Sequence, residues 1–344
     1  MSYGNYAFVS AYLKGEEAKV MSPEHTDRML KASSIQDVLE AIRETDIGSY
    51  FEEVTFKTFD DLDEHLWKYF VQRVNSVESF KFLPKDVLKV SRAYIVKYDV
   101  LNVKAALQSI STGNNSPTIP VGVIHNDGLL NELAAAKNME DIFELLIDCK
   151  LGGYIPALEG YDATGGAKSR LLAEARLDGE YYKGMLNMAR GIKDGSVLSK
   201  AIGLSIDLAN LQIASRAIIE GIGTDAAECA IPGGYTITEK DIRGLLSFKL
   251  VDMPQRLDNP QYRHVAEEIS SSYDKTKNIT VVGEIIDKHK FRLLKEILSP
   301  RVLSPLVMAW YLILKEFELR NLRIILKTIA DGIPAEEIKE YLVS

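Results

Sequence analysis

The chain has 344 residues, enough for two or three domains at the usual size of about 100–200 residues each. With 46% hydrophobic and 26% charged residues, it has the composition of an ordered globular protein, which excludes a largely disordered one. The net charge of -8 argues against nucleic acid as a partner, because phosphate binding needs concentrated Lys and Arg.

Two cysteines, Cys149 and Cys229, are too few for a disulfide framework, and neither has a Cys or His neighbour at metal-ligand spacing. We therefore expect a reducing compartment. The N-terminal segment MSYGNYAFVS lacks the charged and apolar regions of a signal peptide. The longest strongly apolar run, LVMAWYLIL at 306–314, is about half of the roughly 18 residues that a spanning helix needs. We expect no direct insertion into the bilayer.

Short amphipathic helices are predicted near the N-terminus. In SPEHTDRML, Ser22 is a favourable N-cap and Pro23 a favourable first helical residue. The next segment, IQDVLEAIRETDIGSY at 35–50, aligns without a gap with MEDIFELLIDCKLGGY at 139–154, an offset of 104 residues. This alignment indicates a duplicated unit.

The most enzyme-like string is DDLDE, which contains Asp60, Asp61, Asp63 and Glu64. It resembles the aspartate-rich helix that holds magnesium diphosphate in isoprenoid synthases, although its spacing differs. Asp60 and Glu64 would share one helical face, as a metal cluster requires. The acidic first turn of an ordinary helix, favoured by the helix dipole, is the competing interpretation. A magnesium-dependent helical enzyme therefore stays open as the alternative function.

One phrase occurs three times in predicted long helices: KYDVLNVKAA at 97–106, SIDLANLQIA at 205–214 and EFELRNLRII at 316–325. Each phrase contains an acid three residues before an asparagine, and the acids are 108 and 111 residues apart. Apolar residues three and four positions from each asparagine place it on the buried helical face. The three pairs are Asp99 with Asn102, Asp207 with Asn210, and Glu318 with Asn321. We expect these asparagines to be paired inside the protein, where they set helix register, rather than to bind a ligand.

Glycine and polar residues are concentrated at 111–128, 160–168 and 221–236, which indicates loops between repeated units. Further short helices are predicted from Thr238 and from Pro334. The predicted fold is therefore all-α, with few or no strands and three similar modules at 1–110, 111–220 and 221–344. The N-terminal helix pairs with the later part of the chain, and the last module is a truncated return.

No constellation for catalysis appears in the sequence. There is no Gly-x-x-x-x-Gly-Lys phosphate loop and no Gly-x-Ser-x-Gly elbow. The histidines form no close sequence pair, and we expect surface or capping roles for them: His25, His65, His125, His264 and His289. The sequence predicts no catalytic, cofactor-binding or metal site.

The C-terminal stretch VMAWYLILKEFELRNLRIILKTIADGIPAEEIKEYLV, at 307–343, resembles the C subunit of archaeal and bacterial A/V-type rotary ATPases, the relative of the eukaryotic d subunit. The N-terminal region and YDVLNVKAAL support the resemblance, which covers essentially the full chain. One departure is Ser10, Ala11 and Tyr12, where the family often has Asn-Ala-Arg. The motif residues that carry over as fold-defining positions are Glu316, Glu318, Arg320, Asn321, Leu322 and Arg323.

The resemblance implies a funnel of three helical domains seated on the membrane proteolipid ring, on its cytoplasmic side, with the central-stalk subunits D and F at the other end. Such a protein is a non-catalytic part of the rotor, without a cofactor. It couples ion transport through the ring to ATP synthesis or hydrolysis. A helical scaffold for some other membrane complex is a third hypothesis.

Overall fold

The computed structural model describes residues 3–343 and contains helices but no strand within them, with 72% of the chain helical. The predicted all-α fold is confirmed. The α-helices of the first half are α1 (Tyr3–Glu17), α2 (Pro23–Met29), α3 (Ile35–Ala41), α4 (Asp46–Phe51), α5 (Phe59–Glu78), α6 (Lys85–Thr112), α7 (Val123–Asn126), α8 (Leu130–Ala134), α9 (Met139–Asp148) and α10 (Ile155–Leu158). The second half contains α11 (Gly166–Arg190), α12 (Gly195–Ile219), α13 (Glu239–Leu245), α14 (Pro260–Thr276), α15 (Thr280–Leu298) and α16 (Leu306–Ala330). Four 3₁₀ helices complete the described chain: η1 (Gly152–Tyr154), η2 (Thr224–Cys229), η3 (Leu250–Arg256) and η4 (Ala335–Tyr341).

The chain divides into two compact units. Unit 1 comprises Met1–Arg92, Ile192–Asp194 and Phe291–Ser344, and unit 2 comprises Ala93–Gly191 and Gly195–Lys290. Helices α6 and α15 each begin in one unit and end in the other. The three modules predicted from the repeats divide the chain differently, and their boundaries at residues 110 and 220 remain a prediction.

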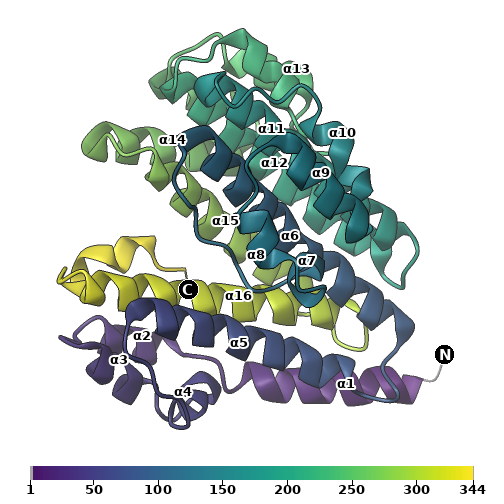
Figure 1. Cartoon of the computed structure of the whole chain (residues 1–344), viewed down its shortest axis with the longest axis vertical. Helices are drawn as coiled ribbons and strands as arrows, with labels where there is room; N and C mark the ends of the chain where they lie inside the picture. Colours follow the sequence, from purple (N-terminus) through teal and green to yellow (C-terminus); the bar gives the residue numbers. More distant parts are fainter. Residues whose placement is uncertain (1–2, 344) are drawn as a thin grey trace. The chain divides into compact units, whose positions relative to one another are not determined.

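Helix α16 is the core helix of unit 1. It packs against α1 and η4, and against α5, which runs beside it in Figure 1. Its first eight residues, Leu306 to Ile313, are all buried, because neighbouring elements cover this helix on more than one side. The indole of Trp310 donates a hydrogen bond to Glu17 at the end of α1 (3.1 Å), which ties the N-terminal helix to α16.

A buried polar network crosses unit 1 beside α16. The ammonium group of Lys315 is buried, and it donates to the Tyr69 hydroxyl (2.7 Å) and to Glu318 (3.0 Å). Tyr69 in turn donates to Asp46 (2.7 Å). Burial raises the pKa of Tyr69 far above its usual range, so the hydroxyl remains a proton donor. The network therefore holds α4, α5 and α16 together through paired charges rather than isolated ones.

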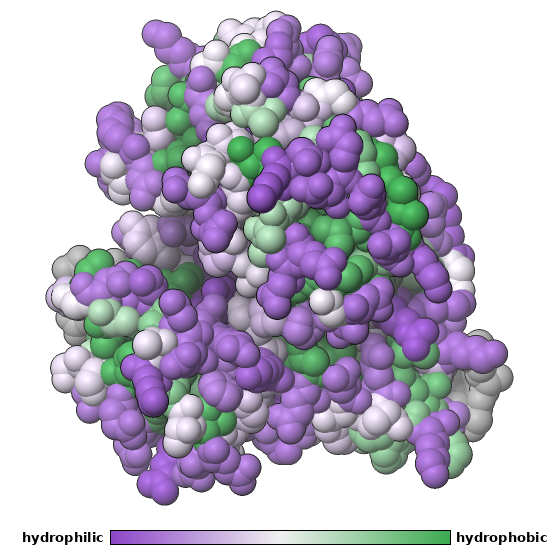
Figure 2. Space-filling model, in the orientation of Figure 1, coloured by the Kyte–Doolittle hydropathy of each residue, from purple (hydrophilic) through white to green (hydrophobic). Residues whose placement is uncertain are grey.

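Helix α12 is the core helix of unit 2 and packs against α11, α13 and α14. It is the one helix among the described residues that is long and apolar enough to cross a membrane. However, 72% of its apolar window is buried inside the protein, as in the core helix of a globular domain. On the face drawn in Figure 2, polar residues cover most of the surface and apolar residues form separated patches.

Side-chain caps explain where the short helices begin. Ser22, Ser34, Asn138 and Thr238 accept a hydrogen bond from the backbone N–H three residues later, at the starts of α2, α3, α9 and α13. The aligned segments at 35–50 and 139–154 form α3 and α9 with the same cap geometry. The predicted N-caps Ser22 and Thr238 are confirmed.

Candidate functional site

Asn102 on α6 is fully buried and bonds to the loop that follows, mainly to Ile119 and more weakly to the Val121 carbonyl (3.5 Å). Its carboxamide oxygen accepts from the Ile119 N–H (2.7 Å), and its Nδ2 donates to the Ile119 carbonyl (2.9 Å). Two strands of an antiparallel sheet exchange the same pair of bonds at a hydrogen-bonded position. The Asn102 side chain thus bonds to Ile119 as a neighbouring strand would. These bonds fix the loop to α6.

The same arrangement occurs on α12 in unit 2. Asn210 is fully buried, its oxygen accepts from the Ile231 N–H (2.7 Å), and its Nδ2 donates to the Ile231 carbonyl (2.9 Å). The donor and acceptor sides of the carboxamide are each satisfied. The geometry of Asn102 therefore recurs 108 residues later in the chain.

A third copy lies on α16 in unit 1. Asn321 is buried and accepts from the Val343 N–H (3.0 Å), while its Nδ2 donates to the Val343 carbonyl (2.5 Å). Each of the three asparagines thus bonds to both backbone groups of one residue that lies 17, 21 or 22 positions later. We call each acid–asparagine pair, with the backbone groups that it binds, a polar clamp.

The acids of the first two clamps bind backbone N–H groups at the start of a short helix or just before it. Asp99 accepts from the N–H groups of Val123 (3.0 Å) and Ile124 (2.9 Å) at the beginning of α7. Burial raises the pKa of Asp99 to about 6, despite these two hydrogen bonds. In this clamp the asparagine binds the loop at Ile119, and the carboxylate binds the start of α7 a few residues further along the chain.

Asp207 makes the corresponding bonds on α12. It accepts from the N–H groups of Thr236 (2.8 Å) and Ile237 (3.0 Å), shortly before α13. It also accepts from the hydroxyls of Thr236 (3.0 Å) and Tyr262 (2.7 Å). The second clamp is therefore the richer in donors, and it reaches α14 through Tyr262.

The third acid binds a segment from the opposite end of the chain. Glu318 accepts from the Met21 N–H (2.8 Å), just before α2, although the two residues are 297 positions apart. The element that the acid anchors in this copy is therefore encoded near the N-terminus. The third clamp joins both ends of the described chain to α16.

Two glycines allow the backbone to approach the aspartates closely. A Cβ atom on Gly122 or on Gly234 would lie 2.4 Å from a carboxylate oxygen of Asp99 or Asp207, respectively. Gly122 also has a positive φ of 114°, which a side chain would strain. In the third clamp the longer side chain of Glu318 provides the reach instead.

The backbone partners were missed from the sequence, although a signal was present. Both loops contain the pattern Ile-Pro-x-Gly, at 119–122 and 231–234. Proline favours an extended conformation of the residue before it, in which N–H and C=O point to the same side. The pattern therefore predicts an extended isoleucine for the asparagine to bind. Three residues later it supplies a glycine, which lets the backbone approach the aspartate closely.

The other motif residues of α16 have separate contacts. Arg323 forms a two-point salt bridge with Asp63 of α5, Arg320 donates to the Tyr341 carbonyl (3.2 Å), and Leu322 is fully buried. Glu316 is partly buried on the same helix. On α1, Ser10 accepts from the Leu303 N–H (3.0 Å), so it anchors this helix where the family often has Asn.

The acidic string at the start of α5 has structural contacts. Asp61 caps the helix together with Thr58, Asp63 pairs with Arg323, and Glu64 pairs with Lys68 (2.7 Å). Asp60 lies in the acidic first turn. A magnesium site would need these carboxylates to turn toward one ion, and three of them are already engaged elsewhere.

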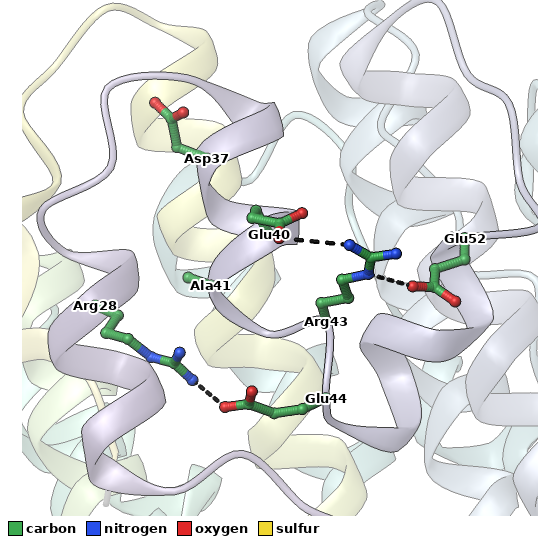
Figure 3. A pocket seen from close by; sticks show the side chains of 7 residues that line it. All are labelled: Arg28, Asp37, Glu40, Ala41, Arg43, Glu44 and Glu52. Atoms are coloured by element: carbon green, nitrogen blue, oxygen red, sulfur yellow. Dashed lines mark hydrogen bonds and ion pairs between the residues drawn. The ribbon is translucent and has the colours of Figure 1, made fainter.

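Unit 1 has an open pocket of about 670 Å³. The residues that line it, which lie between α2 and the end of α4, are drawn in Figure 3. Its charged side chains pair along the wall: Arg28 with Glu44, and Arg43 with Glu52 (2.6 Å) and Glu40 (3.6 Å). These pairs neutralise both arginines. The pocket geometry therefore gives no support for a catalytic or anion-binding site.

Comparison with known proteins supplies the decisive observation. Residues 9–341 match the family model described as ATP synthase (C/AC39) subunit. The chain belongs to this family. The resemblance of the chain to the C subunit of A/V-type rotary ATPases is thereby confirmed.

Curated relatives of this family resemble the chain over nearly its full length. They include the C subunit of the A-type ATP synthase of Methanocaldococcus jannaschii, 23% identical over 98% of this chain and 86% of the relative. The corresponding protein of Thermococcus onnurineus is 25% identical over 99% and 90%, and that of Methanococcoides burtonii 24% identical over 99% and 95%. As a subunit of an ATP synthase complex, the protein has partner subunits, and the complex is membrane-associated.

Proposed function

We propose that this protein is the central-rotor subunit that couples the membrane proteolipid ring to the central-stalk subunits D and F. It is a structural subunit of the complex and not a catalytic one. It sits peripherally at the cytoplasmic side of the membrane and transmits rotation between ion transport and ATP synthesis or hydrolysis. The family match over residues 9–341 carries the proposal.

The polar clamps support a mechanical role. A part that transmits torque must resist sliding between its helices and loops. The asparagines of the clamps are buried, and both polar ends of each carboxamide are bonded, so a shift of the loop would break two hydrogen bonds at once. Under this proposal the fold-defining motif residues keep the helices and loops rigid relative to one another, and they bind no ligand.

An assembly experiment tests the proposed partners. An affinity-tagged copy of the chain, solubilised from native membranes in mild detergent, should co-purify with the proteolipid and with subunits D and F. Mass spectrometry identifies the captured proteins. Capture of a different membrane complex would instead support the scaffold hypothesis and overturn this one.

A coupling assay separates the rotor from the magnesium enzyme. Asp60→Asn combined with Glu64→Gln removes the two carboxylates that share one face of α5 and leaves the Asp61 cap and the Asp63 salt bridge intact. We expect vesicles that contain the variant complex to keep ATP-driven ion transport. Omitting the protein should abolish transport while the catalytic head still hydrolyses ATP. Transport that needs no such protein would contradict the proposal.

A further inference from the structure

Three potential metal ligands from two helices lie together in unit 2. His264 and Glu268 are one turn apart on α14, and His289 lies on α15. One donor atom from each side chain lies within 4.8 Å of the other two. We propose that His264, Glu268 and His289 form a binding site for a transition-metal ion such as Zn²⁺, which links α14 to α15.

The donor set suits zinc better than the hard divalent ions. Imidazole nitrogen and carboxylate oxygen are both common zinc ligands, and two histidines with one glutamate leave a fourth tetrahedral position for water. Magnesium and calcium favour sites made of oxygen alone. The four-residue spacing of His264 and Glu268 places both side chains on one face of α14.

Part of the site is already held in place. His289 is buried, and its Nε2 lies 2.7 Å from Oε2 of Glu268. The other carboxylate oxygen of Glu268 accepts from Lys288 (3.0 Å). A hydrogen bond to a side chain that binds a metal, such as the bond from Lys288 to Glu268, orients that side chain and strengthens metal binding. Zinc binding would release the proton of the His289–Glu268 hydrogen bond and widen that 2.7 Å contact to roughly 3.4 Å, so these two donors start close to the spacing of two ligands.

The third ligand has room to complete the site. Donor atoms about 2.0–2.1 Å from a tetrahedral ion lie roughly 3.4 Å from one another, so the donors must come closer than 4.8 Å. The side chain of His264 is 63% exposed, and its ring meets that of His289 edge to face at 5.6 Å. Under this proposal, rotation of the exposed His264 ring brings its donor nitrogen toward the donor atoms of Glu268 and His289.

Zinc titration of the full chain tests the proposal. We expect calorimetry to show one Zn²⁺ bound per chain, and His264→Ala to weaken binding at least about tenfold, since loss of even an outer contact costs about 10–100-fold. His264 is exposed, so this substitution leaves the packing intact. His125→Ala, which removes a histidine of α7 in the same unit, is the matched control and should bind zinc like the unaltered chain.

Two further readouts connect binding to this location. Zinc should raise the Tm of the unaltered chain and of His125→Ala but not that of His264→Ala. Co²⁺ should show the visible absorption of a tetrahedral ion, which Glu268→Gln abolishes while far-UV circular dichroism stays unchanged. Equal zinc affinity in His264→Ala, or no saturable binding to the unaltered chain, would show that Glu268 and His289 form only a hydrogen-bonded pair.

Discussion

The carboxylate of Asp99 is buried, and its two hydrogen-bond donors among the described residues are both backbone N–H groups. Asp207 likewise accepts from two backbone N–H groups, and it also accepts from two hydroxyls. Desolvation of Asp99 therefore outweighs its hydrogen bonds, and its pKa rises to about 6. The clamp of α6 thus responds to mild acid.

Stability should reflect this shift in a defined direction. The pKa of Asp99 is higher in the folded chain than the usual 3.8, so folding takes up a proton between about pH 4 and 6. The contribution of Asp99 to the free energy of unfolding is therefore largest near pH 4 and falls by about 1–3 kcal/mol as pH rises to 7. Urea denaturation of the unaltered chain and of Asp99→Asn from pH 4 to 7 measures the effect. Parallel pH profiles would show that Asp99 does not titrate in this way.

The buried positions of the clamps followed from periodicity, but their partners did not. Apolar residues on both sides of Asn102, Asn210 and Asn321 in the sequence predict an inward orientation, since a helix repeats every 3.6 residues. Which backbone groups they bind depends on loops such as 113–122, whose course no periodic pattern describes. Likewise His264 and Glu268 have helical spacing in the sequence, whereas His289 joins them only through the packing of α15.

Each clamp joins one long helix to an irregular segment, so its loss should affect that segment first. In unit 2, Asn210→Ala would leave both backbone groups of Ile231 buried without their partner. We expect the free energy of unfolding to fall by roughly 1–3 kcal/mol, measured by urea denaturation.

Ser205→Ala on the same helix is the matched control. Ser205 is also buried, but its hydroxyl bonds to the Ala201 carbonyl within α12 (2.9 Å), a group that the helix itself already satisfies. Its loss should cost less than about 1 kcal/mol. Equal destabilisation by both substitutions would mean that Asn210 acts through packing alone.

The sequence predicted that these segments are helices more readily than it predicted whether each helix is surrounded by protein. The short apolar run at 306–314 became the buried start of α16, whereas α12 turned out to be the helix with the composition of a membrane span. Composition alone cannot separate a core helix from a spanning one, because both are apolar on every side. The packing of α11, α13 and α14 around α12 makes that distinction.

Unit 1 is built from both ends of the chain. Glu318 holds the segment before α2, and one turn later Asn321 holds Val343. Damage to the C-terminal segment should therefore spread to the N-terminal helices of unit 1. Unit 2 contains its own two clamps and should respond less.

Hydrogen exchange can measure this distribution. Deleting residues 334–344 removes the backbone partner of Asn321, and we expect amides of α16 and α2 to exchange at least about tenfold faster, equivalent to roughly 1.4 kcal/mol. Asn321→Ala removes the same bonds at full length and should give a smaller change in the same segments. Equal acceleration in α12 would contradict an effect confined to unit 1.

The long separation between Met21 and Glu318 also has a consequence for biosynthesis. A ribosome that adds about 5–20 residues per second needs roughly 15–60 s to travel the 297 residues between them. During that interval the nascent N-terminal helices lack the partner that completes them. Early engagement by a chaperone would protect their apolar faces until the last long helix emerges from the exit tunnel.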